Sequence, residues 1–441
     1  MTSRPNFYKR CVPLALHGDG VPLTGVGKSW QNTITDFSFY SLLGEGKTPD
    51  LLMFVYCLFD KLRKMGRDST ATAHRFFEIL RWSFRIIWSG TWPSHDYNGR
   101  KYKPGSEEAK KAGKPLADGW YGILFSFCGD LDYYHSLLDL PNSRTASGPC
   151  TLCRTTKYGP LSWQDYRSTA GWRTTCHTPA SWSAQDDKSS CPLFGLPFVT
   201  GVNVCYDWLH CKYVGSDQYM YGALLRLLCF HVLADTAEKN MQAFWSRLKY
   251  EYKRHGTPIQ FRYLNTIKMF LKKTGVAKLR GKAAEIKYLA APFSAVWEHF
   301  KNPHLSLHAD ISLLLKLNKL IEDILIERKG EVSLGEDATR FEEALNAFLS
   351  LQSKVASCLQ EASGENMMAI TEKAHFLQHS AMLSKYLSPR LVWVFGGEDQ
   401  QRRVQCLGKS AVKGNGPTKA VLKMVSKYRM ALHFQFQTHD G

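Results

Sequence analysis

The chain has 441 residues, of which 44% are hydrophobic and 22% are charged, and this is the composition of a globular protein with room for two or three domains. Lys plus Arg number 57 against 39 Asp plus Glu, and this surplus of +18 favours a polyanionic partner, nucleic acid before an acidic membrane surface. A basic solubility surface is the plain alternative. No stretch approaches the roughly 18 consecutive apolar residues of a membrane span, and the first ten residues have no signal-peptide apolar segment, so no membrane association is expected.

The twelve cysteines do not have the pattern of a secreted disulfide framework. Several of them, such as Cys57 and Cys128, lie inside apolar segments of a large chain. Reduced thiols and one zinc site are therefore expected, in the cytosol or the nucleus.

Residues 11–40 alternate apolar and polar groups with glycine breaks, and this pattern predicts two or three antiparallel strands. The first strand reaches Asp19 between two glycines, a setting in which a carboxylate commonly holds a divalent metal. The alternative is a phosphate-binding loop ending in Gly27-Lys28-Ser29. A Walker A loop would need glycine at position 22, where the chain has Pro22, so the metal-binding interpretation is favoured.

A second predicted strand ends in glycine and aspartate, as the first one does. The spacing of apolar residues predicts helices over 50–65 and 70–90, and then a buried strand over 120–128 that ends in Gly129-Asp130. Asp130 and Asp132 are thus alternative second acids beside Asp19. The alternative is that Asp130 and Asp132 are ordinary turn residues that bind no metal.

Residues 141–200 are irregular and rich in Ser, Thr, Gly, Pro, Trp and Cys, so they need a stabilising link, such as a bound metal, to become ordered. Cys150 and Cys153 form a C-x-x-C pair, whose spacing lets two thiolates face one Zn²⁺ ion. Spacing leaves the second pair of ligands open among four candidates: Cys176, His177, Cys191 and His210. Two ordinary free cysteines are the alternative.

From about residue 203 the chain is predicted to be helical. The expected helices cover residues 216–234, 236–255, 259–273, 281–300, 305–328, 336–362, 366–387 and 417–430. Basic side chains predicted to contact nucleic acid are Lys28, Lys278, Arg280, Lys282, Arg402, Arg403 and Lys413. A solvated basic face is the alternative for each group.

Taken in chain order, these motifs resemble the RNase H-like transposases of eukaryotic cut-and-paste elements, in the grouping that holds the CACTA, KDZ and Plavaka types. The matching features are Asp19 with Thr24, Asp132-Tyr133 before the C-x-x-C pair, Asp207 three residues before His210, and Glu285 in a lysine-rich helix start. The resemblance covers roughly residues 11–300. Only about ten residues precede the first predicted strand, which favours a truncated or domesticated member.

The resemblance implies a DNA strand-transferase or nuclease in the nucleus, with two Mg²⁺ or Mn²⁺ ions held by Asp19, Asp132 and Glu285, and with Asp130 as the competing second acid. A homo-oligomer is a further expectation. The implied fold is an α/β RNase H-like core, interrupted by a zinc-knuckle loop and a helical insertion and followed by an all-α C-terminal region. A catalytically inactive, transposon-derived nucleic-acid-binding protein is the main alternative, and a helical scaffold with a structural zinc loop is the third.

The corresponding domain boundaries are the first part of the core at 1–140, the Cys/Trp-rich loop at 141–205, the helical insertion at 206–275, a core-completing helix at 276–300 and the C-terminal helices with a basic tail at 301–441.

Overall fold

A computed structural model of the chain describes residues 4, 6–23, 33–144, 147–186, 188–271 and 276–439. It divides into two compact units. Unit 1 comprises Met1–Asn142, His177–Cys205 and Val394–Gly441, and unit 2 comprises Ser143–Cys176 and Tyr206–Trp393. Within the described residues, no helix is long and apolar enough to cross a membrane.

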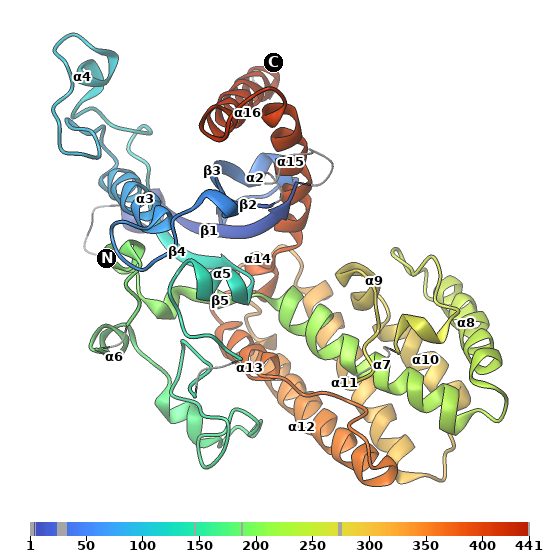
Figure 1. Cartoon of the computed structure of the whole chain (residues 1–441). Coiled ribbons are helices and arrows are strands. Elements are labelled where there is room, and N and C mark those ends of the chain that lie inside the picture. The colour runs from blue at the N-terminus through green and yellow to red at the C-terminus, as the bar shows by residue number, and fades with distance from the viewer. Residues whose placement is uncertain are drawn as a thin grey trace. The chain divides into compact units, whose positions relative to one another are not determined.

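A mixed five-stranded sheet organises unit 1 (Figure 1). Its strands lie in the order β3-β2-β1-β4-β5; β1 is antiparallel to β2 and parallel to β4, and β2 is antiparallel to β3. The strand bounds are Cys11–Pro22 (β1), Thr33–Ser41 (β2), Met53–Phe59 (β3), Tyr121–Gly129 (β4) and Val204–Tyr206 (β5). The strands predicted within 11–40 and over 120–128 are confirmed.

The helix predicted over residues 50–65 is wrong, because Met53–Phe59 forms strand β3 instead. A short apolar run bounded by polar residues fits a buried strand as well as a buried helix, so its periodicity does not decide between them. Pairing with β2 supplies the backbone hydrogen bonds of this run.

Helices cover both faces of the sheet in unit 1. Helix α3 (Thr72–Ser89) packs on one face, where the rings of Phe76 and Phe77 contact Phe37 of β2. The opposite face carries α15 (Phe395–Val412) and α16 (Pro417–His439), which share a buried apolar cluster with β1, β2 and β3. The shorter helices of unit 1 are α1 (Phe7–Arg10), α2 (Thr48–Leu51), α4 (Glu107–Lys111), α5 (Leu131–Ser136) and α6 (Pro179–Ser183).

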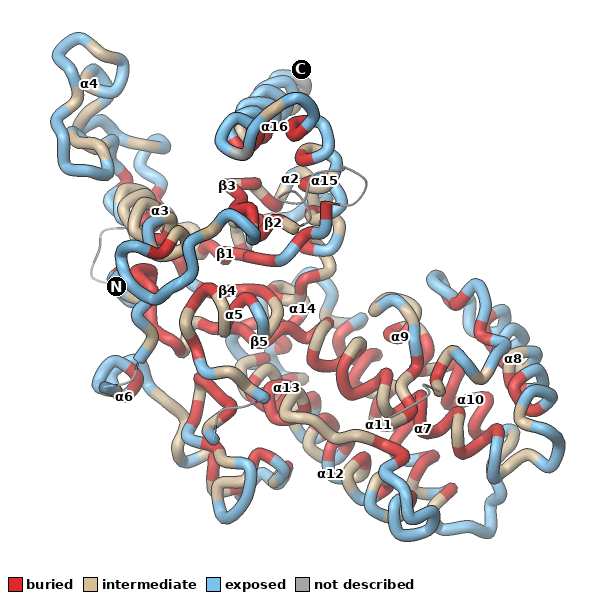
Figure 2. The backbone as a smooth tube through the Cα atoms, viewed as in Figure 1, coloured by how far each residue is buried: buried red, intermediate tan, exposed pale blue. Residues whose placement is uncertain are grey.

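The described part of unit 2 is mainly helical, and the helices α7, α11 and α12 are buried along much of their length (Figure 2). Its α-helices are α7 (Gln218–Leu227), α8 (Ala237–Arg254), α9 (Ala283–Lys287), α10 (Ala290–Phe300), α11 (Ser306–Glu327), α12 (Asp337–Ser363), α13 (Lys373–Leu383) and α14 (Pro389–Val392). Two π-helical segments, η6 (Leu209–Asp217) and η7 (Leu228–Val232), flank α7 directly.

Most of the predicted helices in unit 2 are confirmed, and α8, α11 and α12 begin and end within two residues of their predicted bounds. The helix predicted over 259–273 is wrong in its described part. There the chain is irregular except for the 3₁₀ turn Ile267–Met269. Thr257 and Pro258 suit the first residues of a helix, so local signals favour one here. In the structure, however, the C=O groups of Met269 and Phe270 accept the backbone N–H groups of Arg280 and Lys278.

Candidate functional site

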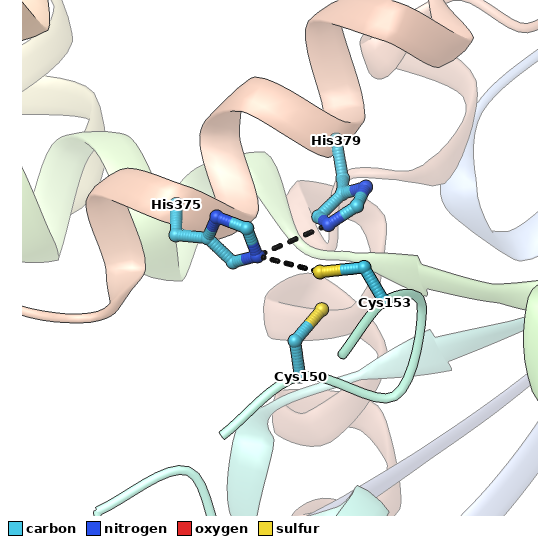
Figure 3. A group of neighbouring side chains, drawn as sticks. All are labelled: Cys150, Cys153, His375 and His379. Carbon is cyan, nitrogen blue, oxygen red and sulfur yellow. Dashed lines mark hydrogen bonds between the residues drawn. The ribbon is translucent and has the colours of Figure 1, made fainter. Parts of the chain in front are cut away.

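Four side chains in unit 2 form a buried group with the composition of a metal site: Cys150, Cys153, His375 and His379. One potential ligand atom from each lies within 4.8 Å of the others, and Figure 3 shows the two sulfur atoms and the two imidazoles turned toward one another. Among the residues that the structure describes, this is the one group of three or more Cys, His, Asp or Glu side chains that meets this distance.

The distances match a tetrahedral ion. Zn–S bonds of about 2.3 Å and Zn–N bonds of about 2.0–2.1 Å place tetrahedral S···N edges at about 3.6 Å and N···N edges at about 3.3 Å. The Cys153 Sγ to His375 Nε2 distance is 3.3 Å, and the two Nε2 atoms of His375 and His379 are 3.1 Å apart. Outward shifts of about 0.2–0.3 Å would accommodate Zn²⁺.

The surroundings favour the ligand forms of Cys150 and His375, whereas the hydrogen bond to Cys150, together with burial, raises the pKa of the Cys153 thiol. Burial raises the pKa of the Cys150 thiol. The hydrogen bond from Cys153 and the neighbouring imidazoles lower it by more than burial raises it, so the pKa lies well below its usual range. Burial lowers the pKa of His375 and thereby keeps its imidazole neutral. The backbone N–H of Leu152 and the Tyr206 hydroxyl also lie at 3.3 and 3.7 Å from Cys150 Sγ, where each can donate to the sulfur.

Local structure positions each member of the group. His375 and His379 are four residues apart on α13, so they lie on one face of that helix. The ring of Trp172 packs against both imidazoles, with centroid distances of 4.5 and 5.1 Å. On the other side, the Thr151 N–H donates to the Tyr206 hydroxyl at 3.0 Å, which fixes the turn between the two cysteines.

The predicted C-x-x-C pair is thus part of the group, whereas the prediction for the second ligand pair is corrected to His375 and His379. The four residues predicted for that pair do not belong to the group: Cys176, His177, Cys191 and His210. His177 and Cys191 lie in unit 1, and the His210 ring pairs with Asp207 through an Nδ1–Oδ2 contact of 2.6 Å. The H-x₃-H spacing of α13 was visible in the sequence, but it lies more than 200 residues beyond Cys153.

A second candidate site lies in unit 1, where β1 and β4 run in parallel. Gly18 pairs with Gly129 in their register, so the next residue on each strand is an aspartate, Asp19 and Asp130. Asp130 keeps an extended backbone (φ −81°, ψ 174°), and its carboxylate accepts the Tyr133 N–H at 2.7 Å. Asp19 therefore lies within β1, next to the end of β4, where Asp130 caps the start of α5.

Asp19 is almost buried, with 8% of its surface exposed, and its carboxylate is held by donors. The Gly20 N–H donates to Oδ1 at 2.7 Å, and the side-chain amide of Gln401 donates to Oδ2. Asp36 lies directly opposite Asp19 on β2 and is fully buried. Burial, together with the negative charge of Asp19, raises the pKa of Asp36 to about 8.

Helix α15 lies along β1 and carries an acid, Glu398, that the sequence analysis did not single out. Gly397 packs so closely on His17 that an added Cβ would come within 2.5 Å of the imidazole, and Gln401 contacts Asp19 one turn later. Glu398 is exposed in the first turn of this helix and shares a face with Gln401, three residues on. Its signal was the Gly396-Gly397-Glu398 sequence, which repeats the glycine–acid pattern of Asp19 and Asp130.

The other predicted acids have different settings. Asp132 is exposed in the first turn of α5, two residues beyond Asp130. Glu285 belongs to unit 2, where its carboxylate accepts the Lys282 N–H at 2.7 Å and so caps the start of α9. The triad of Asp19, Asp132 and Glu285 stays a prediction.

Most of the basic residues predicted to contact nucleic acid are exposed. Arg402, Arg403 and Lys413 are exposed in unit 1, and Arg280 and Lys282 are exposed in unit 2. Lys278 is half-buried, with its Nζ 4.9 Å from the ring centroid of Tyr219. Lys28, like Thr24, lies outside the described residues.

Comparison with known protein families and curated proteins gives no match. No protein-family model matches the chain, and no curated protein matches it significantly. The geometry of the two candidate sites therefore carries the functional argument.

Proposed function

We propose that unit 1 is an RNase H-like nuclease core that cuts and transfers DNA strands with two divalent metal ions. The strand order β3-β2-β1-β4-β5 supports this proposal, since an RNase H-like core extends an antiparallel three-stranded meander with further strands beside β1. Helices on both faces of the sheet are a further point of agreement.

The observation that carries the proposal is the pairing of Gly18 with Gly129, the residues directly before Asp19 and Asp130, with α15 contacting Asp19 through Gln401. Carboxylates from two parallel strands and one helix are a suitable ligand set for Mg²⁺ or Mn²⁺. We propose Glu398 as the third acid in preference to Glu285, because Glu398 lies in the same unit and on the helix that contacts Asp19.

The chemistry divides between the ions and the chain. Divalent ions bound there would lower the pKa of an attacking water or 3′-hydroxyl and neutralise charge on the leaving oxygen. Gln401 and the Gly20 N–H hold Asp19 in one orientation, and capping of α5 does the same for Asp130.

We further propose that Cys150, Cys153, His375 and His379 bind a structural Zn²⁺ ion. The four protein ligands leave no coordination position for substrate, and this is typical of structural rather than catalytic zinc. The ion would tie the irregular segment around Trp172 to α13 within unit 2. A DNA substrate also makes the nucleus the proposed location, and a homo-oligomer stays a prediction.

The test is nicking of supercoiled plasmid DNA in the presence of Mn²⁺. Asp19→Asn, Asp130→Asn and Glu398→Gln are each expected to lower the nicking rate by a factor of about 100 or more, because each removes a charged metal ligand. Asp132→Asn and Glu285→Gln are the matched controls and are expected to stay within about threefold of the unsubstituted protein. Nicking that is lost in Glu285→Gln and kept in Glu398→Gln would assign the third acid to Glu285.

One contact favours the second candidate function, a catalytically inactive nucleic-acid-binding protein. The Gln401 amide donates to Asp19 Oδ2, an oxygen that an active site would use for a metal. If Gln401 locks this oxygen, Gln401→Ala is expected to raise Mn²⁺ binding, measured by calorimetry, without producing nicking. An unsubstituted protein that binds DNA but neither binds Mn²⁺ nor nicks would establish this function instead.

A further inference from the structure

The positive charge of the chain is concentrated in one stretch of unit 2. Between Lys239 and Lys282 the sequence has 12 Lys and Arg residues and one acid, Glu251, so this tenth of the chain carries a net charge of +11 of the total +18. Glu251 is fully buried, and its two carboxylate oxygens pair with Arg247 and Arg254, each at 2.6 Å. Its single negative charge offsets only one of these two positive charges.

Helix α8 presents this charge as an ordered stripe. Its buried side carries Met241, Phe244 and Leu248, and the opposite side is exposed (Figure 2). Arg247, Tyr250 and Arg254 follow one another at intervals of three and four residues, which places them along one line of the helix. Because the ion pairs with buried Glu251 fix the two guanidinium groups, less conformational freedom is lost when they meet a phosphate.

Exposed aromatic rings lie beside positive charges in this stretch of the chain. Tyr250 is 57% exposed, and the Arg247 Cζ lies 4.8 Å from its ring centroid. In the segment after α8, Tyr263 is 62% exposed and the Arg262 Cζ lies 5.4 Å from its ring. Large exposed rings beside arginines are the arrangement on which unpaired bases stack, whereas the bases of a duplex are already stacked on one another.

We infer that Arg247, Tyr250, Lys253 and Arg254 on α8, with Tyr263 in the segment that follows, bind a single strand of DNA. The phosphates would contact the basic side chains and the bases would stack on the tyrosine rings. The choice of DNA over RNA rests on the proposed function of unit 1, because strand cleavage exposes unpaired DNA at the cut ends. The binding chemistry itself belongs to unit 2 and does not depend on the acids of unit 1.

Fluorescence anisotropy with labelled DNA of about 20 nucleotides tests the inference on the full-length protein. Tyr250→Ala is expected to raise the Kd for a single strand at least about fivefold and to change the Kd for the matching duplex less than about twofold. Tyr250→Phe keeps the ring and is expected to bind like the unsubstituted protein. Lys253→Gln is expected to reduce the salt slope of log Kd by about 0.7.

Two results would overturn the inference. One is an unchanged single-strand Kd in both Tyr250→Ala and Tyr263→Ala, and the other is tighter binding to a single strand of RNA than to DNA of the same sequence. Asp19→Asn separates this inference from the proposed function, because it is expected to abolish nicking and to leave single-strand binding intact. If the unsubstituted protein binds a single strand but does not nick plasmid DNA, the nuclease proposal is refuted and the binding inference stands.

Discussion

Removing one ligand should show whether Cys150, Cys153, His375 and His379 bind zinc or are only buried next to one another. Cys153→Ser replaces a thiolate by a hydroxyl of similar shape, so the packing against His375 is kept while a strong zinc ligand is lost. The purified protein is expected to contain about one zinc ion per chain, and the variant is expected to contain about none.

The size of the stability loss follows from linkage. A metal that occupies its site at about 100 times its Kd stabilises the folded form by about 2.7 kcal/mol. For a folding unit of roughly 150–250 residues, the range of unit 2, each kcal/mol corresponds to about 2–4 °C in Tm. Cys153→Ser and chelation of the unsubstituted protein are therefore each expected to lower the Tm of this transition by about 5–11 °C, and the two effects should not add.

Metal analysis and differential scanning calorimetry provide the assay, with Cys176→Ser as the matched control. Cys176 is a half-buried thiol that lies outside the cluster, so its variant is expected to keep its zinc and its Tm. Equal zinc contents in Cys153→Ser and in the unsubstituted protein would refute the assignment of the site.

Three further substitutions test unit-level packing and charge. Burial and a neighbouring carboxylate raise the pKa of Asp36 from 3.8 to about 8, so the folded form holds a proton that the unfolded form has lost. Stability is thus expected to fall by up to about 1.4 kcal/mol per pH unit between about pH 4 and 8, and urea titrations of Asp36→Asn should lack this part of the fall. Gly18→Ala would place a Cβ 2.3 Å from the Tyr133 ring and is expected to cost about 1–3 kcal/mol in the same assay, with no loss arguing against this packing. Lys212→Met leaves buried Asp217 without the ammonium now 2.6 Å away and is expected to cost about 3–5 kcal/mol, whereas Lys212→Met with Asp217→Leu should recover much of this loss in calorimetry.

Local signals in the sequence predicted the elements that carry them. The alternation in residues 11–40 gave β1 and β2, and the apolar stripe of residues 70–90 gave α3. The short apolar run that forms β3 failed as a prediction, because its periodicity fits a helix and a strand alike and pairing with β2 decides between them.

The candidate sites show where sequence reasoning stops. Cys150 and Cys153 were predictable because their spacing alone sets the geometry for one ion. His375 joins them across 222 positions, and Gln401, on the helix that carries Glu398, reaches Asp19 only because α15 returns to β1 after the whole of unit 2. Contacts of this kind depend on how distant elements pack, and a single sequence has no local signal for that packing.

The acidic site in unit 1 can be observed directly by anomalous diffraction from crystals soaked in Mn²⁺. The proposed function predicts two manganese peaks about 3.5–4 Å apart, held by the carboxylates of Asp19, Asp130 and Glu398. Crystals with no manganese at Asp19, or with manganese at Glu285 and none on β1 and β4, would contradict it.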